Sequence, residues 1–349
     1  MWLDGYTPEP SLRSKVKIDD TWASTWSFDG SSTQQATGDN SDCVLRPVSE
    51  YKTIDRIRAD ATRTQPGLEG TYVLCEVLDA KNNPHVSNTR THCEGIVENE
   101  WWFGFEQEYF MYKNGRPLGW PEKGHPRAQG DFYCGVGANN VVGREIVDRH
   151  TEACMNANIG IKGTNAEVAL GQWEFQILGK GIKAGDDLWM ARYLLQRVAE
   201  KQGVSINFSP KPIKGNWNGS GMHTNFSNSL MRDYGGEKLF EDYCETLKDT
   251  HEEAIKSYGS DNKKRLTGKH ETQSIDKFSY GISDRGASIR IPITTVSKAW
   301  HGYLEDRRPA ANADPYKVMR HIVTSLMVLK NTGYPIRHSW RDNIDGLEG

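Results

Sequence analysis

The sequence predicts an α+β fold with two domains, a small β-rich unit followed by a larger unit of mixed strands and helices. The chain has 349 residues, more than a single small core needs. The first hundred residues contain short β-branched and aromatic runs between turns. After Glu98, apolar residues recur at helical spacing between strand-like runs. We therefore divide the chain into domains 1–97 and 98–349.

The first domain contains three runs that favour strands and one that favours a helix. The strands are expected around Val16, around Trp26 and from Tyr72 to Leu78, where β-branched and aromatic residues gather. The helix is expected to begin at Ser49, a favourable N-cap, and to continue through Ile54 and Ile57.

The second domain contains four helical stripes and one further strand, all of which we assign to the core. One helix is expected from Arg144 to Asn158, and another from a cap at Asp186 or Asp187 to Ala199. The alternating run 204–208 favours a strand. The remaining helices are expected from Glu237 to Tyr258 and from Pro315 to Leu329.

Composition excludes two classes of partner. The net charge is −3, so the basic footprint of a nucleic-acid-binding protein is missing. The longest apolar stretch, 322–329, is far shorter than the ~20 residues of a membrane-spanning helix. Six scattered cysteines without a C-x-x-C pair, and an N-terminus unlike a signal peptide, predict a cytoplasmic protein with reduced thiols.

The run W-F-G-F-E-Q-E-Y-F places Glu106 and Glu108 two residues apart in a strand-like segment. Alternate residues of a strand point to the same face, so the two carboxylates should project together. Two ionised carboxylates that close repel unless cations lie between them, which indicates a metal site. The alternative is an ordinary solvated strand face paired with lysine or arginine.

Other fragments add metal-ligand chemistry. Glu167 and Glu174 lie seven residues apart in an aromatic segment, His223 follows the glycine-containing loop N-W-N-G-S-G, and Glu305 precedes two arginines. Five glutamates in one site would carry −5, and two divalent cations would return +4. Carboxylates and one imidazole, without thiolates, favour Mg²⁺ or Mn²⁺.

Arginines close to these acids indicate an anionic substrate, plausibly a nucleoside triphosphate. Arg290 lies in an alternating apolar run, so it should be half buried and need an anionic partner. The polar segment that begins at His270 and Glu271 is expected to be a loop able to close over a site. The phosphate-binding pattern G-x-x-x-x-G-K-[ST] is missing from the sequence.

Eight strings, taken together and in order, resemble the glutamine synthetase family in its shorter, type II form of eukaryotes and some bacteria. They are D-G-S-S-T (29–33), N-S-D (40–42), W-F-G-F-E-Q-E, N-A-E-V with G-Q-W-E-F-Q-I, N-W-N-G-S-G-M-H-T-N-F, K-R-L-T-G-K-H-E-T, S-I-R-I-P and G-Y-L-E-D-R-R-P-A-A-N-A-D-P-Y. They run from residue 29 to 316.

This resemblance implies an N-terminal β-grasp domain and a C-terminal catalytic domain built as an open funnel of antiparallel sheet with flanking helices. It implies ATP-dependent ligation of ammonia to L-glutamate, giving glutamine, ADP and phosphate through γ-glutamyl phosphate. It also implies two or three Mg²⁺ or Mn²⁺ ions per site, and self-association into two stacked pentameric rings with active sites between adjacent subunits.

The resemblance also implies roles for individual residues. Glu108, Glu167 and Glu174 would hold one cation, and Glu106, His223 and Glu305 a second. Arg265, Arg307, Asn218 and Gly219 would bind glutamate, and Asn225, Ser227, Arg285 and Arg290 would lie at the nucleotide and phosphate. Asp42 would bind ammonium and take its proton, Glu271 would close the site, and Arg290 and Arg307 would stabilise the transferring phosphoryl group.

The sequence departs from the family pattern in places, and other functions compete with the implied one. Ile293 and Lys264 stand where the family usually has arginine, Leu304 where it has phenylalanine, and 294–301 is unfamiliar. One competing function is a ligase for another amine. Others are a guanidino kinase, against which Asp42 in a separate domain argues, and a non-catalytic oligomeric scaffold, which loss of a ligand would mark.

Overall fold

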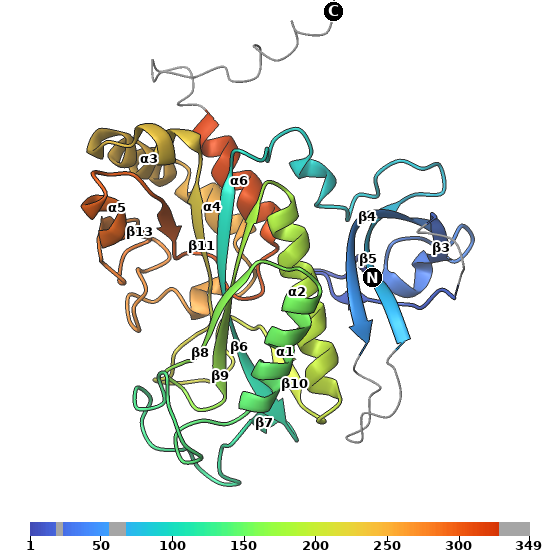
Figure 1. The fold of residues 1–349 in the computed structure, drawn as a ribbon, viewed down its shortest axis with the longest axis horizontal. Helices are drawn as coiled ribbons and strands as arrows, with labels where there is room; N and C mark the ends of the chain where they lie inside the picture. Colours follow the sequence, from blue (N-terminus) through green and yellow to red (C-terminus); the bar gives the residue numbers. More distant parts are fainter. Residues whose placement is uncertain (19–23, 56–67, 328–349) are drawn as a thin grey trace, which may run out of the picture.

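The computed structural model describes residues 1–18, 24–55 and 68–327, which form two adjoining domains (Figure 1). The smaller domain is a three-stranded antiparallel sheet in the order β3-β4-β5. Its strands are β3 (Trp26–Asp29), β4 (Asp42–Asp55) and β5 (Leu68–Leu78), with a short pair β1 (Trp2–Leu3) and β2 (Leu12–Arg13) and the 3₁₀ turn η1 (Gly30–Thr33). Trp2, Phe28, Cys43, Leu45 and Val77 form its own small core.

Two expectations for this domain are wrong. Residues 14–18 carry no strand, and Val16 and Ile18 are 86% and 98% exposed, so no partner strand buries them. Ser49 begins no helix, because it lies inside β4, where Tyr51 pairs with Tyr72 of β5 and is buried. Long-range strand pairing has overridden a local capping signal. Ile57 lies outside the described residues, whereas the strands at Trp26 and Tyr72 are confirmed.

The larger domain is built on a nine-stranded sheet in the order β12-β13-β14-β11-β6-β9-β8, with β7 and β10 also paired to β6. Every pairing is antiparallel except β12 with β13. The strands are β6 (Trp102–Lys113), β7 (Arg116–Pro117), β8 (Ile161–Ala166), β9 (Gln172–Lys180), β10 (Ser205–Asn207), β11 (Met222–Ser227), β12 (Tyr280–Ile282), β13 (Ile289–Ile291) and β14 (Leu304–Asp306). The predicted strand at 204–208 is thus confirmed as β10.

The helices cover the sheet and one of its ends. They are α1 (Arg144–Asn156), α2 (Lys183–Glu200), α3 (Glu237–Asp249), α4 (His251–Ser257), α5 (Ile293–Ser297) and α6 (Pro315–Met327), with the short turns η3 (Thr91–Cys93), the π-helical η4 (Leu230–Tyr234) and η5 (Asn262–Lys264). In Figure 1, α1 and α2 stand between the large sheet and the small domain. Phe103 and Phe105 of β6 are fully buried in the main core with them.

The predicted helices are confirmed with local differences. The run expected from Glu237 to Tyr258 breaks at Thr250 into α3 and α4. Asp186 and Asp187 do not cap α2, because the helix begins three residues earlier, at Lys183. The last helix is α6, and residues 328 and 329 of that expectation lie outside the described part of the chain.

Asp186 and Asp187 instead join the two domains. Asp186 accepts hydrogen bonds from Arg90 Nε (2.9 Å), from the Tyr316 hydroxyl (2.6 Å) and from the Ser49 hydroxyl. The hydroxyl of Tyr51 donates to Asp187 over 2.8 Å. Because both aspartates are buried, these bonds fix how the sheet of the small domain sits on α2 and α6.

The domain boundary after residue 97 stays a prediction, because the segment between β5 and β6 contacts both domains. Asn88 donates to Glu76 of β5 (2.9 Å), whereas the Cys93 thiol lies 3.2 Å from the carbonyl of Tyr316. Among the described residues, no helix has the length and apolar character to cross a bilayer.

Candidate active site

The acidic site is assembled on the face of the large sheet opposite to α1 and α2. On the central strand β6, Glu106 and Glu108 share this face, whereas Gln107 between them points to the core and is fully buried. The pairing register places His223 of β11 beside Glu106, and Glu174 of β9 beside Glu108. Cross-strand neighbours lie on one face, so the register alone brings these side chains together.

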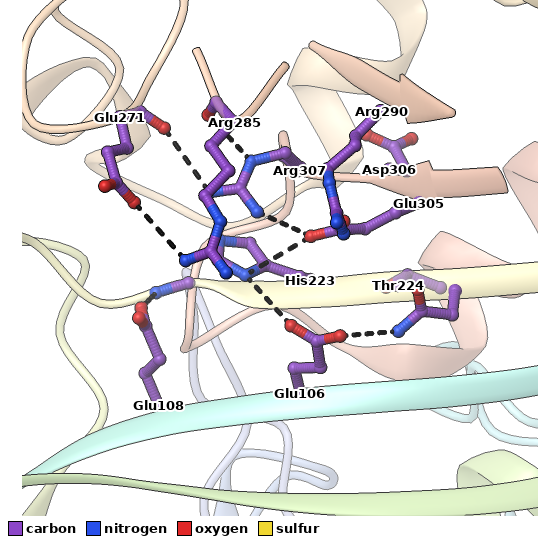
Figure 2. A network of polar contacts seen from close by, with 12 residues as sticks. Glu106, Glu108, His223, Thr224, Glu271, Arg285, Arg290, Glu305, Asp306 and Arg307 are labelled. Atoms are coloured by element: carbon purple, nitrogen blue, oxygen red, sulfur yellow. Dashed lines mark hydrogen bonds and ion pairs between the residues drawn. The ribbon is translucent and has the colours of Figure 1, made fainter. Parts of the chain in front are cut away.

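One group, here called the histidine site, consists of Glu106, His223 and Glu305, whose ligand atoms lie within 4.8 Å of one another. His223 Nδ1 is 3.5 Å from Glu106 and 3.9 Å from Glu305 (Figure 2). Burial, followed by the charges of Arg307 and Arg265, holds the pKa of His223 well below its usual value. The imidazole is therefore neutral, which is the form that binds metals.

Two arginines neutralise Glu305, which is 1% exposed. Arg290 donates to one carboxylate oxygen over 2.8 Å and Arg307 to the other over 2.5 Å (Figure 2). The expectation that a half-buried Arg290 needs an anionic partner is thereby confirmed. Such charged pairs lock the carboxylate in one orientation.

The second group, here called the three-carboxylate site, consists of Glu108, Glu167 and Glu174, again with ligand atoms within 4.8 Å of one another. Neutral groups hold these carboxylates: Asn165 donates to Glu167 (2.9 Å), Gln176 to Glu174 (2.7 Å), and the Gly221 amide to Glu108. In the described chain, no lysine or arginine forms an ion pair with any of the three.

Burial, together with the neighbouring carboxylates, raises the affinity of this site for protons. Burial, and then the charge of Glu108, raises the pKa of Glu167 to about 8. Burial, and then the charges of Glu106 and Glu108, raises the pKa of Glu174 to about 9. Burial also raises the pKa of Glu108. A divalent cation between these oxygens would remove the repulsion that the protons now relieve.

The donor atoms of both groups fit hard divalent cations. Five carboxylates and one imidazole supply oxygen and nitrogen but no sulfur, which suits Mg²⁺ or Mn²⁺ better than a structural zinc ion. The residues fit these cations, because their donor atoms are the kind that the cations prefer and because part of their negative charge is not balanced.

Glycines let the backbone approach these groups. A side chain at Gly221 would place Cβ 2.5 Å from Arg265 Nη2 and 2.8 Å from His223 Nε2, and one at Gly219 would lie 2.4 Å from the carbonyl of Pro210. These distances are too short for a Cβ, so positions 219 and 221 favour glycine.

Arg265, Arg285 and Arg307 line the same face. Arg265 is 5% exposed and donates to the carbonyls of Arg307 (2.9 Å) and Arg308 (3.3 Å), while its Nη2 lies 3.0 Å from His223 Nε2. Arg307 Nε donates to the carbonyl of Arg285 over 2.9 Å. Several guanidinium groups next to five acids suit a substrate that carries several negative charges.

Glu271 lies at the edge of this arginine group. Its carboxylate is 3.9 Å from Arg285, and its carbonyl is 3.5 Å from Arg307 Nη2 (Figure 2). Residues 270–279 carry only turns, bends and a single bridge residue, as the sequence predicts, and both His270 and Glu271 have positive φ. Glu271 is itself held by two long polar contacts, whereas Ile275 further along the loop is anchored by a 3.0 Å hydrogen bond to the carbonyl of Leu266. The beginning of the loop, around Glu271, is therefore the part suited to opening and closing.

The remaining predicted residues differ in whether they contact the acidic groups. Asn225 donates to Glu106 (2.8 Å), whereas Ser227 accepts from Arg232 (2.9 Å). Asn218 exchanges two 2.8 Å hydrogen bonds with Gln129, a residue that the sequence analysis missed because its own segment, 126–130, has no regular pattern.

Asp42 does not lie with the other predicted site residues. It is exposed at the start of β4, and Figure 1 shows that strand in the small domain, on the other side of α1 and α2 from the large sheet. A single chain therefore leaves this carboxylate apart from the two acidic groups.

Comparison with known proteins agrees with this architecture. Residues 1–80 match the family model "Glutamine synthetase, beta-Grasp domain", and residues 88–328 match "Glutamine synthetase, catalytic domain". The chain belongs to the glutamine synthetase family. The two-domain α+β fold expected from the sequence is thus confirmed.

Similar proteins come from bacteria and eukaryotes. A Bradyrhizobium diazoefficiens protein named glutamine synthetase is 51% identical over 340 residues, which cover 93% of this chain and 94% of its own. A Drosophila melanogaster protein named mitochondrial glutamine synthetase 1 is 46% identical over 342 residues, 94% of this chain and 83% of its own. A Frankia alni glutamine synthetase is 49% identical over 335 residues, 94% of this chain and 90% of its own.

Proposed function

We propose that this chain joins ammonia to L-glutamate with hydrolysis of ATP, giving L-glutamine, ADP and phosphate. The observation that carries the proposal is the pairing of two acidic groups, Glu106, His223 and Glu305 with Glu108, Glu167 and Glu174, beside Arg265, Arg290 and Arg307 on one sheet face. This arrangement occurs in a chain that matches the family over nearly its whole length.

The two acidic groups would each hold one divalent cation, Mg²⁺ or Mn²⁺, and a third ion could enter with the nucleotide. When bound, the cations supply positive charge to the phosphate oxygens and to the carboxylates around them. Glu106 and Glu108 lie two residues apart on one strand, and each would be a ligand of a different ion.

The side chains of this chain would then orient and polarise the substrates. Arg265, Arg307 and the 218–219 loop would bind glutamate, while Asn225, Ser227, Arg285 and Arg290 would lie along the nucleotide phosphates. A γ-carboxylate oxygen of glutamate attacks the γ-phosphorus of ATP, and the bond from that phosphorus to the ADP oxygen breaks. Arg290 and Arg307 donate to the oxygens on which negative charge develops.

The second step consumes the resulting acyl phosphate. Ammonia attacks the γ-carbonyl carbon, the carbon–oxygen bond to phosphate breaks, and the carboxylate of Asp42 takes the proton that nitrogen loses. Glu271 would close the 270–279 loop over the intermediate and keep water away from it.

The position of Asp42 supports a composite site. Because α1 and α2 separate it from the acidic groups of its own chain, we propose that it acts in the site of an adjacent subunit within a ring. Two stacked pentamers are the assembly we expect. We also propose a cytoplasmic location, which six unpaired cysteines support.

The decisive experiment measures phosphate release from ATP with Mg²⁺ and glutamate, with and without ammonium, together with glutamine. Ammonium-dependent phosphate release matched by glutamine is the expected result. Release that responds to another amine would keep the fold and the cations but change the acceptor. No turnover with any amine, together with no Mg²⁺-dependent thermal stabilisation by ATP, would point to a scaffold.

Asp42→Ala separates the two steps. This variant should still release phosphate slowly, because the phosphoryl-transfer groups are intact, but should form little glutamine. Normal glutamine formation by the variant would remove Asp42 from its proposed role.

A further inference from the structure

Arg192 of α2 is a buried arginine behind the acidic sheet face. Its side chain is 2% exposed, and it packs over the rings of Trp189 (4.7 Å) and Phe208 (5.4 Å). Its guanidinium donates twice to the Gln107 side-chain oxygen, over 2.8 Å from Nε and 2.6 Å from Nη2. Nη2 also reaches the carbonyls of Ala311 and Ala313, each over 3.0 Å, and the sulfur of Met222 over 3.1 Å.

Each of these contacts belongs to a segment that carries a side chain of the acidic groups. Gln107 stands between Glu106 and Glu108 on β6, and Met222 immediately precedes His223 on β11. Ala311 and Ala313 follow β14, which carries Glu305. The side-chain amide of Gln107 adds two hydrogen bonds, to the carbonyls of Glu108 (2.9 Å) and Ala311 (3.0 Å).

This arrangement carries an electrostatic cost. In the described part of the chain, Arg192 forms no ion pair, and burial lowers its pKa to about 9, with Asp314 partly opposing that change. At this cost, the guanidinium fixes the Gln107 oxygen and the carbonyls of Ala311 and Ala313 in position, which an apolar side chain of similar volume would not do.

We propose that Arg192 is a positioning residue that sets the spacing between the histidine site and the three-carboxylate site by bracing β6, β11 and the 311–313 segment from behind. The inference rests on the proposed function, because it assumes that both groups bind divalent cations. A guanidinium is needed because Nε and Nη2 together hold the Gln107 oxygen while Nη2 also reaches the carbonyls of Ala311 and Ala313, an arrangement that the single ammonium of lysine does not reproduce.

The test compares Arg192→Lys, Arg192→Met and Gln107→Met with the unmodified full-length protein. Two quantities are measured: the Mg²⁺ concentration that gives half of the maximal thermal stabilisation without nucleotide, and the Mg²⁺ dependence of glutamine formation. We expect all three variants to need about 10-fold or more Mg²⁺ in both measurements, by analogy with groups that orient metal ligands. Lysine should not restore the unmodified value.

Leu195→Ala is the matched control. Leu195 lies on the same helix and is fully buried, but its apolar side chain has no group that could hydrogen-bond to the segments that Arg192 braces. This variant should lose thermal stability and keep the unmodified Mg²⁺ requirement. A control that also raised the requirement would show that general loosening of α2 is sufficient, and would overturn the specific role of Arg192.

Other outcomes also decide the matter. A normal Mg²⁺ concentration for half-saturation in Arg192→Lys would show that the positive charge alone is sufficient, and would overturn the bracing role. If Arg192→Met did not fold, normal values in both Arg192→Lys and Gln107→Met would still overturn the bracing role. If the unmodified protein makes glutamine with Mg²⁺ while the variants keep its half-saturation, only this inference fails. If the unmodified protein shows neither response to Mg²⁺, the proposed function fails and the inference falls with it.

Discussion

The histidine site and the three-carboxylate site lie side by side on one sheet face but balance their charge differently. In the first, Arg290 and Arg307 compensate Glu305, and a neutral His223 replaces a carboxylate. In the second, the hydrogen-bond donors to the three carboxylates are neutral groups within the described residues, and the pKa values of Glu167 and Glu174 rise to about 8 and 9. The first site is thus preorganised without cations, whereas the second is under electrostatic strain until a proton or a cation enters.

The largest expected effect comes from removing the ligand that the arginines hold. Glu305→Ala should lower turnover by on the order of 10³-fold or more, because it removes a cation ligand and leaves Arg290 and Arg307 without their acceptor. Steady-state glutamine formation measures the loss, and size-exclusion chromatography should show unchanged assembly. Near-normal turnover would contradict the assignment of the histidine site.

Neutral isosteres should separate the two sites by the sign of their effect on stability. Without divalent cations at pH 8, Glu174→Gln should raise the melting temperature by about 2–4 °C, because glutamine is neutral without a proton, whereas Glu174, with a pKa of about 9, must take up a proton when the chain folds. Glu305→Gln should lower it by a similar amount, because it weakens two charged hydrogen bonds.

Differential scanning calorimetry in chelator measures both changes, and activity should fall in both variants. If Glu174→Gln is less stable than the unmodified protein, the three carboxylates do not repel one another in the way described.

The three-carboxylate site should also make stability depend on pH. Glu167 and Glu174 have pKa values near 8 and 9 in the folded chain against a reference value of 4.5, so the native state binds more protons than the unfolded state in between. In chelator, this contribution to stability is complete below about pH 4.5 and is lost as pH rises toward 9.

Melting temperatures with and without Mg²⁺ across this range check the sign. The gain from Mg²⁺ should grow with pH, and Glu174→Gln should reduce that growth. A gain that is constant between pH 6 and 9 would contradict the raised pKa values.

The smallest expected effect is steric. Gly221→Ala should lower turnover by roughly 10-fold, because its Cβ would displace both Arg265 and His223. Gly70→Ala is the control, since a Cβ there meets no atom within 4 Å. Equal activity of the two variants would show that the backbone at Gly221 shifts without cost to the site.

Much of the catalytic domain could be predicted from the sequence because its signals are local. The spacing of Glu106 and Glu108 and the stripes of α1, α2 and α6 reflect strand and helix periodicity, which tertiary packing here reinforces. The β-grasp domain was harder to predict. Ser49 has the chemistry of a helix cap, but pairing with β5 along β4 and a hydrogen bond to Asp186 decide its conformation.

Partners distant in sequence could not be predicted either. The hydrogen bonds of Arg192 to Gln107, of Asn218 to Gln129 and of Tyr316 to Asp186 join residues 85, 89 and 130 positions apart, and no spacing along the chain encodes them. Asp42 could be selected by resemblance, which also assigned it to the small domain, and the structure adds that α1 and α2 stand between that domain and the large sheet (Figure 1).

The place of Asp42 beyond α1 and α2 has a genetic consequence. If each site uses Asp42 of an adjacent subunit, rings made only of Asp42→Ala chains and rings made only of Glu305→Ala chains are both inactive. In a mixed ring, a site is intact wherever a Glu305→Ala chain supplies Asp42 to an adjacent Asp42→Ala chain, which supplies Glu305. Random mixing in equal amounts would restore about a quarter of the sites. Two defective alleles of this gene would then complement each other within one assembly, and a defective copy would impair the product of a healthy one.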